Sequence, residues 1–327
     1  MAQDAHPRTA IEIGLAAAIV AINADTPLIL VAGASRDGER GLPWGPFDAP
    51  AHRTFEIALR RFVAEQAALE VGYVEQLYTF GDRGRHAREG DTVPHIVSVG
   101  YLALTRMPAA DALKASGARF EPWYKFFPWE DWRDGRPKVL DASILPALIA
   151  WAKSAKPVAG AALNPRERVR LSFGAEGAPW DEERVLERYE LLYSAGMIAE
   201  AQRDGRENAL ARGKAELLGE TMRFDHRRIL ATAISRLRAK LKYRPVVFEL
   251  MPESFTLSAL QRAVEAIAGV PLHKQNFRRA LERAELVEGL GRVDADTGGR
   301  PAELFRFRRE ILGARPVSGL SLPLLRD

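Results

Sequence analysis

Thr256–Phe307, TLSALQRAVEAIAGVPLHKQNFRRALERAELVEGLGRVDADTGGRPAELFRF in one-letter code, decides how the C-terminal third of the chain folds. Its first part predicts a helix, because apolar residues recur there at helical spacing. These residues are Leu257, Leu260, Val264 and Ile267. Thr256 is a suitable N-cap for this helix. Gly269 is suited to follow its C-terminus, with Pro271 just beyond.

A second helix is predicted over residues 273–285, about four residues after the first. Phe277, Leu281 and Ala284 would face inward. The opposite side carries long donor side chains, which suit phosphates and the edges of guanine or adenine in a major groove. We predict DNA contacts for His273, Lys274, Gln275, Asn276, Arg278 and Arg279. Two helices joined through a short, glycine-containing connection are typical of a helix-turn-helix.

Two strands are predicted after the helix pair, over Leu286–Val293 and Ala302–Phe307. The turn between them, DTGG at 296–299, ends at Arg300, which could reach a minor groove or a phosphate. The pattern therefore predicts a winged helix-turn-helix domain. The alternative is an all-α domain whose basic helix is only a solvated surface.

Charge is distributed unevenly along the chain. Residues 223–327 hold 20 Lys+Arg against 12 Asp+Glu, a net charge of +8. Residues 1–222 hold 27 against 31, a net charge of −4. A basic end on an acidic body is expected of a protein that binds polyanions, so this asymmetry favours DNA binding.

Length and composition set the limits of the fold. A chain of 327 residues can form two domains with separate cores. Hydrophobic residues at 47% and charged residues at 28% are typical of a folded soluble protein. With no cysteine, disulfides and thiolate metal sites are excluded. Because the sequence shows no signal-peptide pattern and no run long enough to span a bilayer, we expect a cytoplasmic protein with no membrane partner.

The N-terminal half alternates apolar strands with helices. The predicted strands are Ile11–Ile22, Pro27–Ala34, Val74–Phe80 and His95–Thr105, and the predicted helices are His52–Leu69 and Ala142–Lys153. Asp141 is placed to cap the second helix. The aromatic run WYKFFPWEDW, Trp123–Trp132, is expected to close the core or to form a dimer face.

A long amphipathic helix is predicted from Asp225 to about Tyr243. Its apolar stripe comprises Ile229, Leu230, Ile234, Leu237 and Leu241. We interpret it as the first helix of the winged domain, with Arg238 and Lys242 on a basic side that contacts DNA phosphates. Residues 154–222 contain further helical segments and are interpreted as a connector.

Several segments resemble one family. LPWGPFD at 42–48 stands where a Nudix domain has its LPGG loop, and VEQLYTFGDRGR at 74–85 is followed by IVSVGYLAL at 96–104. DHRRILATAISRLRAKLKYRPVVFELMPESFTLSALQRAVEAIAG at 225–269 and HKQNFRRALERAELV at 273–287 continue the likeness. Over residues 11–309 the chain resembles the Nudix-related regulators of NAD metabolism, the NrtR-type repressors, and most closely the alphaproteobacterial NAD regulator NadQ.

The resemblance implies an α+β fold in three parts. We expect a Nudix-like α/β/α sandwich that senses a nucleotide at 1–153, a helical connector at 154–222 and a winged helix-turn-helix domain at 223–327. The implied effector is an adenine nucleotide, namely ADP-ribose, NAD or ATP, and no other cofactor is expected.

The catalytic Nudix box is degenerate. That box holds divalent cations on glutamates along one helix face. Aligned on Arg61, it matches only Arg61 and Glu65. The other required glycines and glutamates are replaced by Phe47, Arg53, Phe62, Gln66 and Ala68. One carboxylate cannot hold a cluster of cations, so we predict no catalytic residues, no metal site and no hydrolysis.

The nucleotide pocket implied by the resemblance can be assigned candidate residues. Aromatic rings could stack on a base, arginines could pair with phosphates, and polar groups could bind ribose or adenine edges. The candidates are Arg36, Trp44, Phe47, Arg53, Tyr78, Phe80, Asp82, Arg85, Ser98 and Tyr101.

The resulting hypothesis is a homodimeric repressor of NAD biosynthesis genes that binds a palindromic double-stranded operator. Nucleotide binding would change its DNA affinity. The main alternative is an active Nudix pyrophosphohydrolase with a nucleic-acid-binding appendage. A weaker alternative is a structural protein whose basic domain binds acidic protein surfaces.

Overall fold

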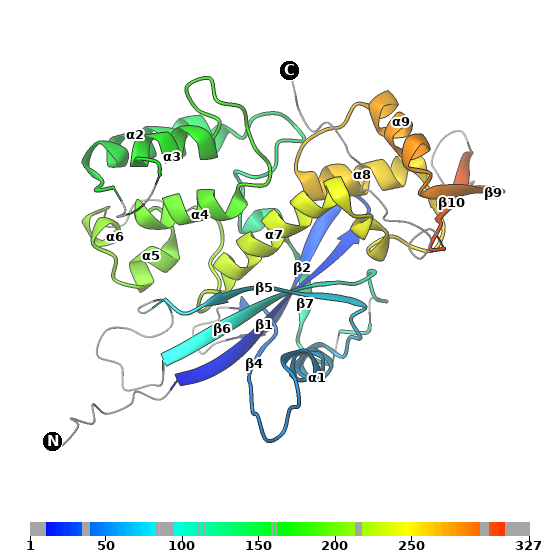
Figure 1. Cartoon of the computed structure of the whole chain (residues 1–327), viewed down its shortest axis with the longest axis horizontal. Helices are drawn as coiled ribbons and strands as arrows, with labels where there is room; N and C mark the ends of the chain where they lie inside the picture. Colours follow the sequence, from blue (N-terminus) through cyan, green and yellow to red (C-terminus); the bar gives the residue numbers. More distant parts are fainter. Residues whose placement is uncertain are drawn as a thin grey trace.

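A mixed seven-stranded sheet forms the centre of the N-terminal part (Figure 1). The computed structural model describes residues 11–34, 40–82, 85, 95–109, 111–113, 115–157, 160, 162–212, 218–294 and 301–310. The predicted site residues Arg36 and Arg300 lie outside this set. The strands are β1 Ile11–Asn23, β2 Thr26–Ala34, β3 Arg40–Gly41, β4 Trp44–Pro46, β5 Tyr73–Phe80, β6 His95–Leu104 and β7 Arg119–Pro122.

The strand order is β3-β2-β1-β6-β5, with β4 paired to β1 and β7 to β2. Only β1 and β6 run parallel among these pairs. β1 is buried without a break from Gly14 to Ile22. A strand with no polar alternation needs cover on both faces of its sheet.

Helices cover both faces of this sheet (Figure 1). On one face lies α1, Phe55–Ala67, which buries Leu59 and Val63. Its N-cap Thr54 accepts a hydrogen bond from the Ile57 main-chain N–H. On the other face lies α7, His226–Tyr243. The Nudix-like α/β/α sandwich expected from the sequence is therefore present.

α7 belongs to both parts of the molecule. It crosses β1, β5 and β6, packs against α4, and contacts α8 of the C-terminal part. All five residues of its predicted apolar stripe are buried. The sequence predicted α7 as part of the winged domain alone. In the structure α7 also forms the helical layer that covers the face of the sheet opposite α1.

Five helices form the predicted connector and its approach: α2 Leu145–Ser154, α3 Pro165–Ser172, α4 Val185–Ser194, α5 Ala199–Arg203 and α6 Glu207–Arg212. A π-helical turn, Leu140–Ile144, leads into α2. The prediction that Asp141 caps this helix is wrong. Its carboxylate instead pairs with Arg136, with Oδ2 2.9 Å from Nε.

The aromatic run at 123–132 closes a core. After β7 the chain makes a short 3-10 turn, Trp123–Lys125. Trp123, Phe127 and Trp129 are then fully buried against the connector helices and α7. Of the two roles expected for this segment, core closure is the one observed.

The C-terminal part is a winged helix. It contains a 3-10 turn at Val246–Glu249, β8 Phe255–Thr256, α8 Leu257–Ala268, α9 Lys274–Ala284, β9 Val287–Asp294 and β10 Ala302–Phe307. The strands pair in the order β8-β10-β9. The predicted caps are confirmed: the Thr256 hydroxyl accepts from the Ala259 N–H at 3.1 Å, and Gly269 ends α8 at φ 74°. Among the described residues, no helix meets the length and hydropathy needed to cross a membrane.

Candidate functional site

The exposed face of α9 carries the first candidate site. Phe277 and Leu281 anchor the helix in the core, 1% and 2% exposed. The predicted DNA-contacting residues all lie on the solvent side: His273, Lys274, Gln275, Asn276, Arg278 and Arg279. None of their side chains forms a hydrogen bond or ion pair with the described part of the chain. These donors are therefore free to meet a polyanion.

The helix pair is fixed to the N-terminal part at the end of α8. The Trp132 N–H donates to the Gly269 carbonyl at 2.7 Å, and the Tyr124 hydroxyl donates to the Ala266 carbonyl at 2.7 Å. The Arg238 Nε–H donates to the Ile267 carbonyl at 2.9 Å. These bonds satisfy carbonyls that a helix end leaves unpaired, so α8 keeps a defined position relative to the sheet.

Arg238 was predicted to contact DNA, and the structure contradicts this. Its side chain is fully buried, with Nη1 2.7 Å from the Glu130 carboxylate. Arg188, also fully buried, binds the same carboxylate at 2.6 Å. Burial opposes ionisation of Glu130, but the two guanidinium groups outweigh it and hold its pKa below the usual value. The charge of Arg238 is thus used inside the protein.

The Lys242 ammonium is also paired with carboxylates of the protein. Its ammonium lies 2.7 Å from Glu182 and contacts Glu183. The side chain is 37% exposed, so it reaches solvent but is already paired. The sequence could not show this, because both acids lie about sixty positions away in the chain.

The sheet divides the predicted nucleotide-binding residues between two faces. Phe47 and Tyr101 belong to the core on the α1 side. Phe80 belongs to the core on the α7 side, where Ser98 is also fully buried. The Arg228 guanidinium covers the Phe80 ring at 5.0 Å. These residues do not form one pocket, and the assignment of Phe80 and Ser98 to an open ligand surface is wrong because α7 covers them.

Arg85 is buried in an ion-pair cluster, and Asp82 lies at the exposed edge of this cluster. Arg85 is 2.7 Å from Glu190 and 3.6 Å from Asp225, and Asp82 pairs with Arg228. Burial raises the pKa of Asp225 to about 6, although Arg85 and Arg228 act in the opposite direction. The expected pairing of Arg85 with a ligand phosphate is wrong for this arrangement, because its guanidinium is 7% exposed and held by two carboxylates.

On the α1 side, Phe47 packs edge-on against Phe55 at 4.6 Å, and the Tyr101 hydroxyl lies 3.4 Å from Gln76. Tyr101 is therefore a core residue, and Phe47 is partly buried against the same core. Tyr78, 61% exposed, and Arg53 remain open to solvent and to a ligand.

Trp44 lies apart from both of these groups of residues, near the start of α7. Its ring lies over Gly14 and 5.5 Å from the Phe224 ring. Its indole N–H is buried and has no hydrogen-bond partner among the described residues. The Arg223 guanidinium lies 5.6 Å from the Phe224 ring, and Arg223 is not among the residues predicted to bind a nucleotide. Nothing in the local pattern distinguishes Arg223 from the other arginines of this basic segment.

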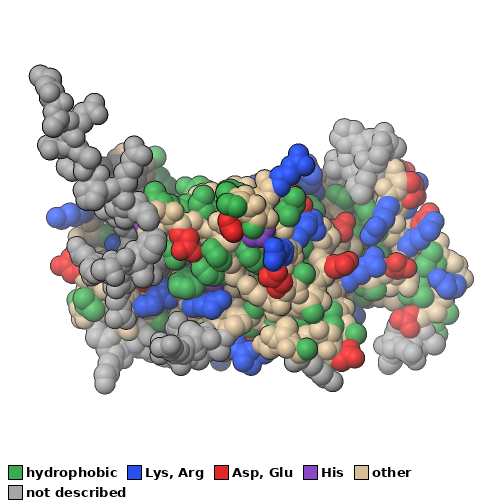
Figure 2. Space-filling model, turned by 90° about the horizontal axis from the view of Figure 1, so that it is seen from below, with side chains coloured by type: hydrophobic (Ala, Val, Ile, Leu, Met, Phe, Trp, Pro, Cys, Tyr) green, Lys and Arg blue, Asp and Glu red, His purple; other side chains and the backbone are tan. Residues whose placement is uncertain are grey.

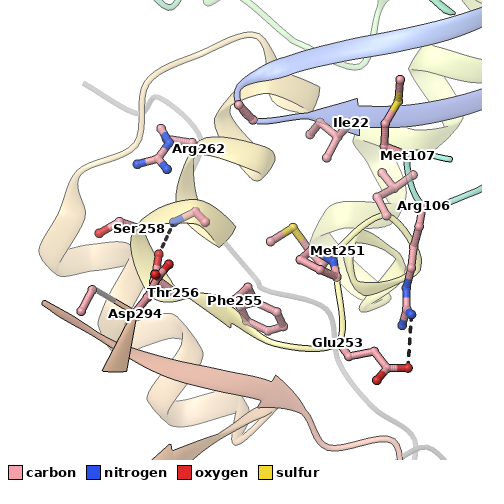
Figure 3. A pocket seen from close by; sticks show the side chains of 15 residues that line it. Ile22, Arg106, Met107, Met251, Glu253, Phe255, Thr256, Ser258, Arg262 and Asp294 are labelled. Carbon is pink, nitrogen blue, oxygen red and sulfur yellow. Dashed lines mark hydrogen bonds and ion pairs between the residues drawn. The ribbon is translucent and has the colours of Figure 1, made fainter. Parts of the chain in front are cut away.

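A cleft of about 860 Å³ lies between the end of the sheet and the start of α8 (Figure 3). Ile22 and Met251 line this cleft. Arg106 forms an ion pair with Glu253 there, with Nη1 3.5 Å from Oε1. None of the predicted nucleotide-binding residues lines it. Its two arginines are balanced by Glu253 and Asp294, so it lacks the net positive charge that a diphosphate needs. No cluster of three or more His, Cys, Asp or Glu that could hold a metal ion occurs within the described ranges.

Comparison with known proteins agrees with this geometry. Residues 247–307 match the family of the NrtR DNA-binding winged helix domain. The ADPR responsive transcriptional repressor NtrR of Acinetobacter baylyi is 40% identical over 84 residues, which make up 26% of this chain. The match spans 33% of that repressor's length.

The fold is shared with solved structures over most of the chain. Shewanella oneidensis NrtR, complexed with a 27mer DNA, superposes with a TM-score of 0.52 at 20% identity, covering 90% of this chain and 93% of that one. A MutT/nudix family protein from Enterococcus faecalis gives 0.51 at 17% identity, covering 94% and 90%. At this identity the likeness establishes the fold, and the closer resemblance to NadQ stays a prediction. The chain thus joins a domain of Nudix-like fold to a C-terminal domain that is similar to the NrtR DNA-binding winged helix.

Proposed function

We propose that this protein is a transcriptional repressor that binds double-stranded DNA through α9 and responds to a nucleotide. The exposed, unpaired row of donors on α9, within an NrtR winged helix, is the observation that carries the proposal. Phe277 and Leu281 hold the helix so that its N-terminal half can enter a major groove. The Acinetobacter relative is named as a repressor and the Shewanella relative was solved with DNA, which supports the same role here.

The effector and the targets follow from the relatives and the sequence resemblance. ADP-ribose is the first candidate effector, because the Acinetobacter repressor is named as ADPR responsive. NAD and ATP are the other candidates. A homodimer would place two α9 helices in successive major grooves of a palindrome, about 34 Å apart. The proposed targets are NAD biosynthesis genes, and the proposed compartment is the cytoplasm.

We propose further that the Nudix-like domain does not hydrolyse its ligand. At one glutamate position of the box, Phe62 packs its ring 5.5 Å from that of His52. At another, Gln66 donates through Nε2 to the Trp44 carbonyl at 2.6 Å, which a carboxylate could not do. Glu65 is paired with Arg61 at 2.7 Å. Steady turnover of ADP-ribose with magnesium would support the hydrolase alternative instead.

An electrophoretic mobility shift assay tests DNA binding, with a palindromic site taken from upstream of a proposed target gene as the probe. Arg279→Ala should weaken binding by about 1–3 kcal/mol, the value of a bidentate base contact, and Lys274→Ala should weaken binding to all sequences, as the loss of a phosphate contact does. Arg166→Ala is the matched control, because Arg166 is an exposed arginine of α3. Added ADP-ribose should shift the wild-type Kd by about 5–150-fold. Unchanged affinity in both α9 variants would remove α9 as the reading helix.

A further inference from the structure

Arg223 lies on the α7 face of the sheet, just before α7 begins. Its guanidinium nitrogens are 3.4 and 3.5 Å from where a Cβ of Gly33 would stand. Its Cγ and Nε are both 2.7 Å from the Cβ position of Gly41. Glycine on β2 and β3 thus makes room for Arg223, and at Gly41 also for the His226 ring.

Arg223, like the neighbouring half-buried Arg40, has no acidic partner, whereas most buried or half-buried arginines around it have one. Six arginines pair with carboxylates: Arg85, Arg188, Arg203, Arg227, Arg228 and Arg238. No ion pair joins Arg223 to any described residue, and its Nε–H is buried without an acceptor. Burial lowers the pKa of Arg223, whereas the pKa values of Arg203 and Arg228 are raised. A half-buried cation without an anion is costly, and a bound anion would remove that cost.

The surrounding backbone holds Arg223 in place. Its N–H donates to the Arg40 carbonyl at 3.1 Å. Arg203 donates to the carbonyls of Met222 and Phe224 at 3.0 and 2.7 Å. Phe224 adopts a left-handed φ of 52°, which is strained for an aromatic residue. Strain of this kind persists where the surroundings fix a functional geometry.

We propose that Arg223 binds a phosphate group of the effector nucleotide, with the Trp44–Phe224 ring pair as the apolar surface beside it. A guanidinium can bind phosphate oxygens through two parallel N–H bonds. This inference rests on the proposed nucleotide sensing. This site would also link ligand binding to the winged helix, since Arg223 lies three residues before His226, the first residue of α7, and α7 contacts α8.

Calorimetric titration of the full chain with ADP-ribose tests the proposal, with inorganic pyrophosphate as a second probe. Arg223→Gln should raise the Kd for both probes about tenfold to a hundredfold, because it removes a charged hydrogen-bond donor. Arg223→Lys should recover part of the loss, since it keeps the charge without the planar fork. Arg244→Gln should bind as the wild type does, because Arg244 is exposed at the far end of α7.

The unliganded Arg223→Gln protein should melt no lower than the wild type. The guanidinium has no acid to lose, and glutamine keeps the stem that packs over Gly41. A fall of several degrees would instead make Arg223 a structural residue and overturn the proposal.

The binding outcomes separate this inference from the proposed function. Equal ADP-ribose affinity in wild type and Arg223→Gln would overturn the inference alone. A wild type that binds pyrophosphate through Arg223 but not ADP-ribose would overturn ADP-ribose sensing and support the anion site. A wild type that binds neither probe would overturn both.

Discussion

Single charged residues inside this protein are matched to partners far away in the sequence. Glu130 lies between Arg188 and Arg238, and Arg227 lies against Glu200 at 3.1 Å. Removing one member of such a group leaves a buried charge uncompensated, which is more destabilising than the loss of a surface pair. Arg238, which looks like a DNA contact in the sequence, is therefore part of the core.

Asp225 should make stability depend on pH. Burial raises the pKa of its carboxyl to about 6 from an ordinary 3.8. The native carboxyl then holds its proton more tightly than the unfolded one, so its contribution to stability is complete below pH 3.8 and falls as pH rises to about 6. The full fall is about 3 kcal/mol, at about 1.4 kcal/mol per pKa unit.

Urea unfolding of the wild type and Asp225→Asn between pH 4.5 and 7 checks this. The variant also loses the pairs with Arg85 and Arg228, so its absolute stability is not the readout. The wild-type free energy of unfolding should fall relative to that of the variant as pH rises. Parallel curves across this range would show that Asp225 does not titrate there.

At the scale of elements, the local sequence pattern was enough to predict the winged helix. It was not enough to predict what α7 packs against. α8 and α9 follow from their own apolar spacing and caps, and Thr256 and Gly269 act as predicted. The stripe of α7 is equally clear, but a stripe does not identify its partner. The Nudix-like sheet is one partner of α7. Arg238 faces inward because Glu130 and the end of α8 cover another side of the helix.

The predicted nucleotide-binding residues show the same limit, because their positions in the chain do not tell which of them lie together in space. The sequence placed aromatic and basic residues near one another along the chain, but alternate residues of β6 face opposite sides of the sheet. Tyr101 therefore points to α1, while Ser98 lies on the α7 side. Arg223 could not be selected, because its distinguishing feature is the absence of an acidic neighbour in space.

The docking of α8 can be tested at its C-cap residue, Gly269. Gly269→Ala should lower the free energy of unfolding for two reasons. The residue has a left-handed φ of 74°, and the new Cβ would clash with the Glu130 carbonyl. Gly291→Ala is the matched control, because Gly291 has φ 64° but open space around its Cβ position. The control should lose about 1 kcal/mol of stability. Gly269→Ala should lose several kcal/mol more.

Thermal melting of both variants gives the comparison, and hydrogen exchange locates the effect. Amides of α8 should exchange faster in Gly269→Ala, because the contacts with Trp132 and Tyr124 depend on this helix end. Similar melting temperatures for the two variants would mean that the Glu130 loop moves aside easily.

At the scale of the whole molecule, the basic end and the acidic body should steer the protein onto DNA. α9 projects from the upper side of the winged end (Figure 1). On the face seen from below, that end mixes Lys and Arg with acidic side chains, and hydrophobic side chains gather over the middle (Figure 2). The contacts with phosphates should therefore come from the α9 side.

The salt dependence of DNA binding measures those contacts. The slope of log K against log salt concentration changes by about 0.9 for each phosphate contact. Lys274→Ala should therefore lower the slope by about one per protomer. Lys242→Ala should leave it unchanged, because Lys242 is already paired with Glu182 and Glu183. Equal losses in the two variants would mean that Lys242 leaves its carboxylates when DNA binds, and that the end of α7 then contributes to the interface as well.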